Sequence, residues 1–174
     1  MKKSYLFAKF RSFFLKKYSM RDYYIKDGMK IGKNPRIFCD IYTPEAYLIE
    51  IGDNVTISTK VQLITHDASI AKALPGTTDV FGRIKIGNNC FIGAGAIVMY
   101  GCTLADNTIV AAGSVVTKSF NEPGKVIGGN PARVLCDVSQ FAEKYKDRAV
   151  STKGLTWEEK RDFLLKNEDK LIKR

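Results

Sequence analysis

The chain has 174 residues, 45% hydrophobic and 26% charged, which suits one folded domain with a buried core and excludes a disordered composition. Its net charge of +10 comes from the ends, because residues 1–30 carry +7, residues 31–138 are neutral and residues 139–174 carry +3. A nucleic-acid-binding protein more often concentrates positive charge on its reading surface, so we expect no nucleic acid partner. No apolar run reaches transmembrane length, and Lys9 and Arg11 interrupt any signal-peptide core, which predicts a cytoplasmic protein.

The first 30 residues are predicted to be a basic amphipathic segment with a helix over residues 4–20. One stripe of this helix is aromatic, formed by Phe7, Phe10, Phe14 and Tyr18. A basic amphipathic helix can lie on the anionic inner face of a membrane, here through residues 1–20. It can equally pack on the rest of the protein with its lysines in water. The sequence leaves both interpretations open.

Residues 31–136 are organised by an aliphatic residue at every sixth position. The longest run is Ile86, Ile92, Val98, Leu104, Val110 and Val116, and shorter runs are Ile51, Ile57, Leu63 and Ile31, Ile37. Neither an α-helix, with a period of about 3.6, nor a plain strand, with a period of about 2, produces this spacing. A hexapeptide repeat is typical of a parallel β-helix, in which the aliphatic side chains fill the interior of each coil.

The cysteines follow the same repeat. Cys90 and Cys102 occupy its small-residue positions, and neither they nor Cys39 and Cys136 form a C-x-x-C pair. We therefore expect packed free thiols, as in a reducing cytoplasm, and neither disulfides nor metal ligands.

The repeat is interrupted after Leu63, where the next aliphatic residue would fall at position 69 but appears only at Ile86. This predicts an inserted loop of 17 residues within about residues 67–85. A loop of that length inside a compact repeat is more often functional than idle. The only histidine of the chain, His66, directly precedes it.

The coil length predicts which residues meet in space. If three hexapeptides close a coil of about 18 residues, Leu63, Val98 and Val116 occupy one face of successive coils. His66 then stacks beside Gly101, and Lys118 lies next to the same column. A general base, an approachable backbone and a lysine would share one edge of the β-helix.

The repeats end near residues 128–131, and residues 137–174 are predicted to be a helical C-terminal segment. A short helix is expected over residues 139–146. A second helix is better signalled, because Thr156 and Glu159 form a capping box. Terminal helices would cap the open ends of a β-helix, which otherwise expose unpaired strand edges.

Residues 31–136 resemble the hexapeptide-repeat acyltransferases, a family with a left-handed parallel β-helix. The most specific motifs are Ile51-Gly52-Asp53-Asn54-Val55, Ile86-Gly87-Asn88-Asn89-Cys90-Phe91-Ile92-Gly93, Ala112-Gly113-Ser114-Val115-Val116-Thr117-Lys118 and Gly128-Gly129-Asn130-Pro131-Ala132-Arg133. The last two resemble the maltose, galactoside, xenobiotic and capsular-sugar O-acetyltransferase branch. The resemblance implies a mainly β fold, a homotrimer, and acetyl-CoA bound between neighbouring β-helices without a metal.

The resemblance implies that His66 is a general base that takes a proton from a hydroxyl as it attacks the thioester. Imidazole suits this role because its pKa lies near working pH. A backbone N–H would stabilise the oxyanion, and the register favours Gly101. Asp67, Glu50 or a backbone carbonyl are the alternatives for orienting His66. Asp67 and Glu50 are also the candidate residues for binding the acceptor substrate.

The family also implies which residues hold the acyl donor. Thr117 and Lys118 match positions that contact CoA, and Arg133 matches one that meets its phosphates, where cations donate charge-assisted hydrogen bonds. Ala111 and Ala112 would let the pantetheine arm run close to the backbone.

The expected activity is O-acetylation of a sugar hydroxyl in the biosynthesis of capsule, lipopolysaccharide or another surface polysaccharide. Acetylation of a small hydroxylated antibiotic and a non-catalytic β-helix used for assembly are alternatives. A zinc hydratase built on this fold needs three histidine ligands, and the chain has one histidine. The residues name neither the acceptor nor the acylated atom, O or N.

Overall fold

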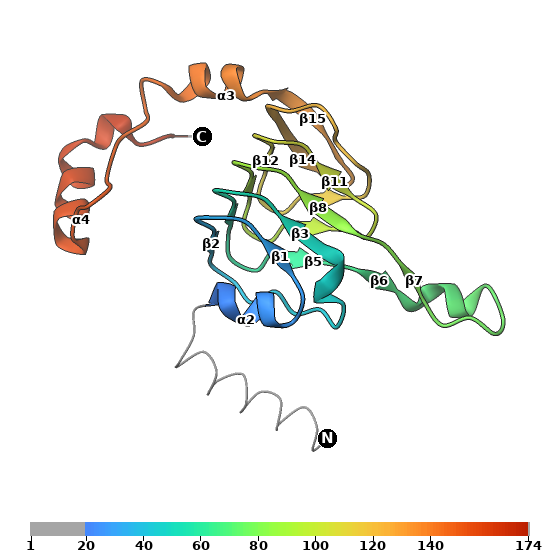
Figure 1. The fold of residues 1–174 in the computed structure, drawn as a ribbon. Coiled ribbons are helices and arrows are strands. Elements are labelled where there is room, and N and C mark those ends of the chain that lie inside the picture. Colours follow the sequence, from blue (N-terminus) through green and yellow to red (C-terminus); the bar gives the residue numbers. More distant parts are fainter. Residues whose placement is uncertain (1–19, 174) are drawn as a thin grey trace.

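The computed structural model describes residues 20–173 (Figure 1). The helix predicted over residues 4–20 lies outside these residues, except for its last position. The described chain begins with helix α2 (Met20–Lys26), followed by short strands that wind as successive coils. The coil strands are β1 (Lys30–Ile31), β2 (Arg36–Ile37), β3 (Ile49–Ile51), β4 (Thr56–Ile57), β5 (Gln62–Leu63), β8 (Ile84–Ile86), β9 (Phe91–Ile92), β10 (Ile97–Val98), β11 (Thr103–Leu104), β12 (Ile109–Val110) and β13 (Val115–Val116).

These strands stack into three parallel sheets, which form the faces of a β-helix. The sheets have the orders β1-β3-β8-β11, β5-β10-β13 and β2-β4-β9-β12-β14-β15. The last sheet ends in an antiparallel pair, β14 (Lys125–Gly129) and β15 (Ala132–Asp137). The predicted period of six residues is therefore one short strand and one turn.

The repeat residues form the core in the predicted register. Leu63 pairs with Val98, and Val98 pairs with Val116. Val98 and Val116 are fully buried, and Leu63 is nearly so. Each aliphatic side chain packs on its equivalents in adjacent coils, so each of the three faces adds one column to the core that stabilises the stack.

Each strand of the β1-β3-β8-β11 sheet is followed by a turn that contains an asparagine in the left-handed conformation. Asn34, Asn54, Asn89 and Asn107 all have positive φ angles, between 52° and 59°. Asparagine tolerates this left-handed conformation better than most residues. The Asn34 side-chain amide donates to Asn54 at 3.2 Å, so the turns also stack by hydrogen bonding.

A hairpin leaves the coil between β5 and β8 and projects from the β-helix (Figure 1). It contains β6 (His66–Asp67), the short 3-10 helix η2 (Ala68–Lys72) and β7 (Val80–Phe81). The two strands are antiparallel, with His66 opposite Phe81. This excursion occupies the place at which the hexapeptide period breaks.

Helix α2 covers the N-terminal end of the β-helix. Its Tyr24 is 2% exposed, and the Tyr24 hydroxyl accepts from the backbone N–H of Ile41 at 2.9 Å and donates to the carbonyl of Cys39. A helix therefore caps this end, but it is α2, which the sequence did not predict, and the predicted helix over residues 4–20 is not among the described residues apart from its last position.

The C-terminal end differs from the expectation that terminal helices cap the coil. Helices α3 (Val138–Tyr145) and α4 (Trp157–Lys166) bury no residue, nor does the 3-10 helix η3 (Glu168–Lys170), and α4 stands away from the sheets in Figure 1. The Thr156–Glu159 capping box is present as predicted, but Trp157 is 68% exposed. The local signal therefore starts the helix without determining what it packs against.

The four cysteines are free thiols, as expected, with Cys90 and Cys102 buried in the coil. Burial raises the pKa of both thiols. Within residues 20–173, no helix is both long and apolar enough to cross a membrane.

Candidate active site

The sole histidine lies at the point where the hairpin leaves the coil. The preceding residue, Thr65, is 1% exposed and still belongs to the interior of the β-helix. The His66 side chain is 36% exposed, so its ring spans the boundary between core and solvent. This position fixes the backbone of His66 while leaving the imidazole accessible.

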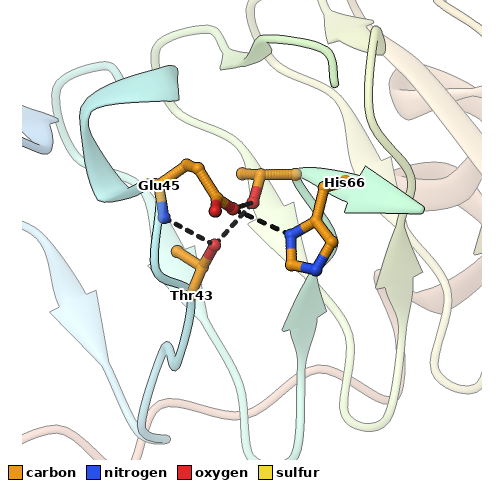
Figure 2. Close-up of polar contacts among 4 residues, drawn as sticks. Thr43, Glu45 and His66 are labelled. Atoms are coloured by element: carbon orange, nitrogen blue, oxygen red, sulfur yellow. Dashed lines mark hydrogen bonds and ion pairs between the residues drawn. The ribbon is translucent and has the colours of Figure 1, made fainter. Parts of the chain in front are cut away.

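Glu45 binds the imidazole from the preceding turn. Its Oε2 lies 2.8 Å from His66 Nδ1, and its side chain is 13% exposed (Figure 2). Burial alone would raise the pKa of the Glu45 carboxyl, but hydrogen bonds from Thr65 and His66 outweigh it and lower that pKa. Glu45 is therefore ionised at neutral pH, and His66 Nδ1 donates to it.

The two carboxylates expected as alternatives for orienting His66 do not do so. The Asp67 carboxylate accepts from the backbone N–H of Ser69 at 2.8 Å and caps η2, and this bond is the main cause of its lowered pKa. Glu50 lies on β3, where Lys30 binds it at 2.9 Å and lowers its pKa. Any contact of either residue with an acceptor stays a prediction.

Sequence reasoning missed Glu45 because the hexapeptide frame breaks there. The turn after Pro44 shifts the register between Thr43 and Ile51, so counting along the repeat could not place its residues. One feature of the sequence could have indicated Glu45. It is an acidic residue in the irregular turn one coil before His66, where a carboxylate can reach the imidazole.

Gly101 follows Val98 by three residues, as His66 follows Leu63 on the neighbouring coil, and the backbone that contacts it is the returning arm of the hairpin. A Cβ at Gly82 would lie 2.4 Å from the Gly101 nitrogen, so the two backbones are in close contact and only glycine fits at position 82. The Gly82 N–H donates to the carbonyl of Thr65 at 3.0 Å. Gly101 itself has φ +77° and is exposed. Its role towards an oxyanion stays a prediction.

An exposed aromatic ring borders the imidazole. Phe81 of β7 lies with its ring centroid 5.8 Å from that of His66, tilted by 44°. Phe81 is 55% exposed, so one side of the ring contacts His66 and much of the rest is open. An exposed aromatic side chain beside a base is suited to contact an apolar face of a ligand.

The predicted acyl-donor residues lie further along the stack. Thr117 and Lys118 are exposed in the turn after β13, next to the column of Leu63, Val98 and Val116. The Lys118 ammonium lies 5.7 Å from the centroid of the Phe120 ring.

A surface pocket brings Lys118 together with a lysine that sequence reasoning missed. Lys118, Phe120 and Lys125 all line this pocket. Lys125 pairs with Asp137 at 2.6 Å, which raises its pKa. Arg133 is exposed on β15 and does not line this pocket, although its neighbour Val134 does, so its place beside the acyl donor stays a prediction. Ala111 is half-buried, Ala112 is exposed, and both precede the tight turn at Gly113, which has φ +70°.

A family model described as bacterial transferase hexapeptide (six repeats) matches residues 83–118. Protein CapG of Staphylococcus aureus is 38% identical over 146 residues, which are 80% of this chain and 84% of that protein. Two solved structures are also similar: a maltose O-acetyltransferase from Clostridium difficile 630, with 37% identity and a TM-score of 0.57, and a galactoside acetyltransferase in complex with coenzyme A, with 31% identity and a TM-score of 0.52.

The matches with the solved structures cover 63% and 67% of this chain but only 59% and 58% of those chains. They confirm the predicted fold class, a mainly β protein built on the left-handed parallel β-helix.

Proposed function

This chain is an acyltransferase that belongs to the hexapeptide-repeat transferases, and we propose that it transfers the acetyl group of acetyl-CoA to a hydroxyl group of a sugar. The observation that carries this proposal is the Glu45–His66 pair beside the hairpin, 2.8 Å apart. An ionised carboxylate on Nδ1 leaves Nε2 as the proton acceptor. The maltose and galactoside enzymes named among its structural relatives support a sugar acceptor.

The mechanism follows from this arrangement. His66 Nε2 takes the proton of the acceptor hydroxyl as the hydroxyl oxygen attacks the thioester carbonyl carbon. The carbonyl oxygen becomes an oxyanion, for which a backbone N–H, in our proposal that of Gly101, is the donor. When the intermediate collapses, the carbon–sulfur bond breaks and the imidazolium returns the proton to sulfur. The products are an O-acetylated sugar and free CoA.

We place the acyl donor along the edge that carries Thr117 and Lys118. Lys118 and Arg133 would meet its phosphates, and Ala111 and Ala112 would border the pantetheine arm. Pantetheine is narrow and amide-bearing, so small side chains and an accessible backbone suit it.

We propose surface polysaccharide or its lipid-linked precursor as the acceptor. The basic end of the chain, which can lie on an anionic membrane, supports the precursor. We accordingly propose a cytoplasmic enzyme. Residues 1–20 are open to two interpretations, a contact to the inner face of the membrane or packing on the protein, and truncation separates them.

Outward-facing side chains support a homotrimer. The sheet β1-β3-β8-β11 presents Lys30, Glu50 and Lys85. In the other two sheets the outward positions of the first coils are polar, Arg36, Thr56 and Gln62, and those of the later coils are the apolar residues Phe91, Ile97, Ile109 and Val115. Apolar outer faces are typical of surfaces covered by another copy, and light scattering that gives the mass of a monomer for the active enzyme would contradict this assembly.

An acetyl-transfer assay tests the activity. The purified protein should release CoA from acetyl-CoA only when a suitable sugar is present, and mass spectrometry should find the acetylated sugar. His66→Ala should lower kcat by about 10²–10⁴-fold, as for the loss of a general base, with little change in acetyl-CoA affinity. Retention of more than about a tenth of wild-type turnover would remove His66 from the mechanism.

A further inference from the structure

Two threonine hydroxyls stand behind the Glu45 carboxylate and have no part in the mechanism so far. Thr65 Oγ1 donates to Glu45 Oε2 at 2.7 Å. The Thr43 and Thr65 hydroxyl oxygens lie 2.6 Å apart, and the backbone N–H of Glu45 donates to Thr43 Oγ1 at 3.4 Å. Figure 2 shows that these contacts close a ring, which starts at the backbone nitrogen of Glu45 and returns to its own carboxylate.

The chemistry of the groups determines the direction of every hydrogen bond in the ring. An ionised carboxylate can only accept, so the single proton of Thr65 points to Glu45. Thr65 then has no proton left, and the Thr43 hydroxyl must donate to Thr65. Thr43 in turn accepts from the backbone N–H of Glu45. No other orientation satisfies all of these contacts at once.

This directed ring bears on which nitrogen of His66 carries the proton. Oε2 accepts from Thr65 and also meets His66 Nδ1. Nδ1 could accept from Glu45 only if the carboxyl were protonated. A hydrogen bond donated to the carboxylate favours the ionised form and so opposes that state. The Thr65 hydroxyl therefore favours a proton on Nδ1 and a free lone pair on Nε2.

We propose that Thr43 and Thr65 are positioning residues, which act through Glu45 to hold neutral His66 in the tautomer with its proton on Nδ1. In Figure 2 the other ring nitrogen points away from Glu45, which leaves it available to a ligand. The catalytic consequence rests on the proposed function, because only a base at Nε2 makes the tautomer matter for acetyl transfer. The tautomer itself can be measured without any acceptor.

Nitrogen NMR of the imidazole tests the proposal, and His66 gives one unambiguous pair of signals because the chain has a single histidine. Above the pH at which the ring becomes neutral, the wild type should show the Nδ1–H form almost exclusively. Thr65→Val keeps the shape of the side chain and removes the hydroxyl that holds the Glu45 carboxylate against Nδ1. The carboxylate can then turn away, and the form with the proton on Nε2 should appear beside the Nδ1–H form. Thr43→Val should shift the mixture in the same direction, and Thr65→Ser, which keeps the hydroxyl, should restore the wild-type signal.

Kinetics provide the second measurement. Thr65→Val should lower kcat by about tenfold, the factor expected for one buried hydrogen bond, without changing the KM for acetyl-CoA. Thr108→Val is the matched control, because Thr108 is also fully buried and donates to the carbonyl of Ala105 at 2.7 Å, in a turn that does not touch His66. It should alter the melting temperature alone.

A wild-type tautomer with the proton on Nε2 would overturn the proposal. So would a folded Thr65→Val variant with an unchanged tautomer ratio and unchanged kcat. If Thr65→Val does not fold, Thr43→Val decides the question, since Thr43 is only half-buried. An Nδ1–H tautomer that depends on Thr65 in a protein without acetyltransferase activity would support the ring and overturn the proposed function.

Discussion

Glu45 binds His66, the only histidine, through a single carboxylate oxygen, Oε2. The contribution of its charge can therefore be tested by a substitution that removes the charge alone. Glu45→Gln keeps the shape and removes the charge. We expect kcat to fall by about 10- to 100-fold, the range for loss of a hydrogen bond to a charged group. Glu143→Gln on α3, where the side chain is 70% exposed, is the control and should leave kcat unchanged.

Glu45 also predicts a pH dependence of stability. Because the folded-state pKa of its carboxyl is lowered, the ionised form stabilises the protein above the unfolded pKa of about 4.3. This contribution is lost as the pH falls through the folded value. Urea denaturation should therefore find Glu45→Gln less stable than the wild type at pH 7, and the difference should narrow on acidification. A constant difference would mean that the charge contributes nothing to stability.

Two cations carry the proposed donor site, and their contributions can be separated. Lys118→Ala and Arg133→Ala should each weaken CoA binding by about 1–3 kcal/mol if both hold phosphates. Calorimetry with dephospho-CoA should show a smaller loss for the residue that meets the 3′-phosphate. Lys144→Ala is a matched control for Lys118, because its ammonium also lies over an aromatic ring, that of Tyr145 at 5.4 Å. Unchanged CoA affinity in both variants would rule out the assignment.

The β6–β7 hairpin begins at His66 and projects from the β-helix on the side that carries this histidine. Its helix η2 buries no residue, whereas Phe81 at its base contacts the imidazole. Replacing residues 68–79 with an Asn-Gly turn would keep His66 opposite Phe81, because this dipeptide closes tight hairpins.

We expect the shortened protein to keep the melting temperature of the wild type, since nothing buried is removed. The acceptor kcat/KM should fall by about tenfold if the hairpin forms a wall of the acceptor site. The KM for acetyl-CoA should stay the same, because the residues proposed to hold it lie in later coils. An unchanged acceptor kcat/KM with the short turn would show that residues 68–79 do not form part of the acceptor site.

The elements also show which kinds of sequence signal predict structure. The pairing of Leu63, Val98 and Val116 was predictable because a strict period carries the coil length with it. Glu45 was not, because Pro44 interrupts that period and nothing local determines where an irregular turn directs its side chain. The capping box of α4 predicted where the helix begins, but its place in the molecule depends on tertiary contacts, and local capping does not encode these.

At the scale of the whole molecule, the charge and the core are separated along the chain. The coils have no net charge, and aliphatic side chains fill their interior. Most of the excess positive charge lies in the first 30 residues. α2 covers the N-terminal coil through Tyr24. Residues 1–19 carry six basic and no acidic residues, and this composition has two explanations, a membrane contact or packing on the protein.

Deleting residues 1–19 separates the two explanations, because Met20, the first residue of α2, then starts the chain. If the segment contacts a membrane, the truncated enzyme should keep its oligomeric state and acetylate a soluble acceptor normally. It should lose binding to anionic vesicles, and the binding of the full chain should weaken as salt rises, because exposed charges are screened.

If the segment instead packs on the protein, truncation should lower the melting temperature or the solubility. The full chain should then show no salt-sensitive binding to anionic vesicles. We expect this second outcome, because leaving Phe7, Phe10 and Phe14 in water costs about 1.5–3 kcal/mol for each side chain that packing would bury. Calorimetric melting and vesicle sedimentation at low and high salt distinguish the two. Salt-sensitive vesicle binding that disappears on truncation, with stability intact, would overturn this expectation and make the N-terminus a membrane contact.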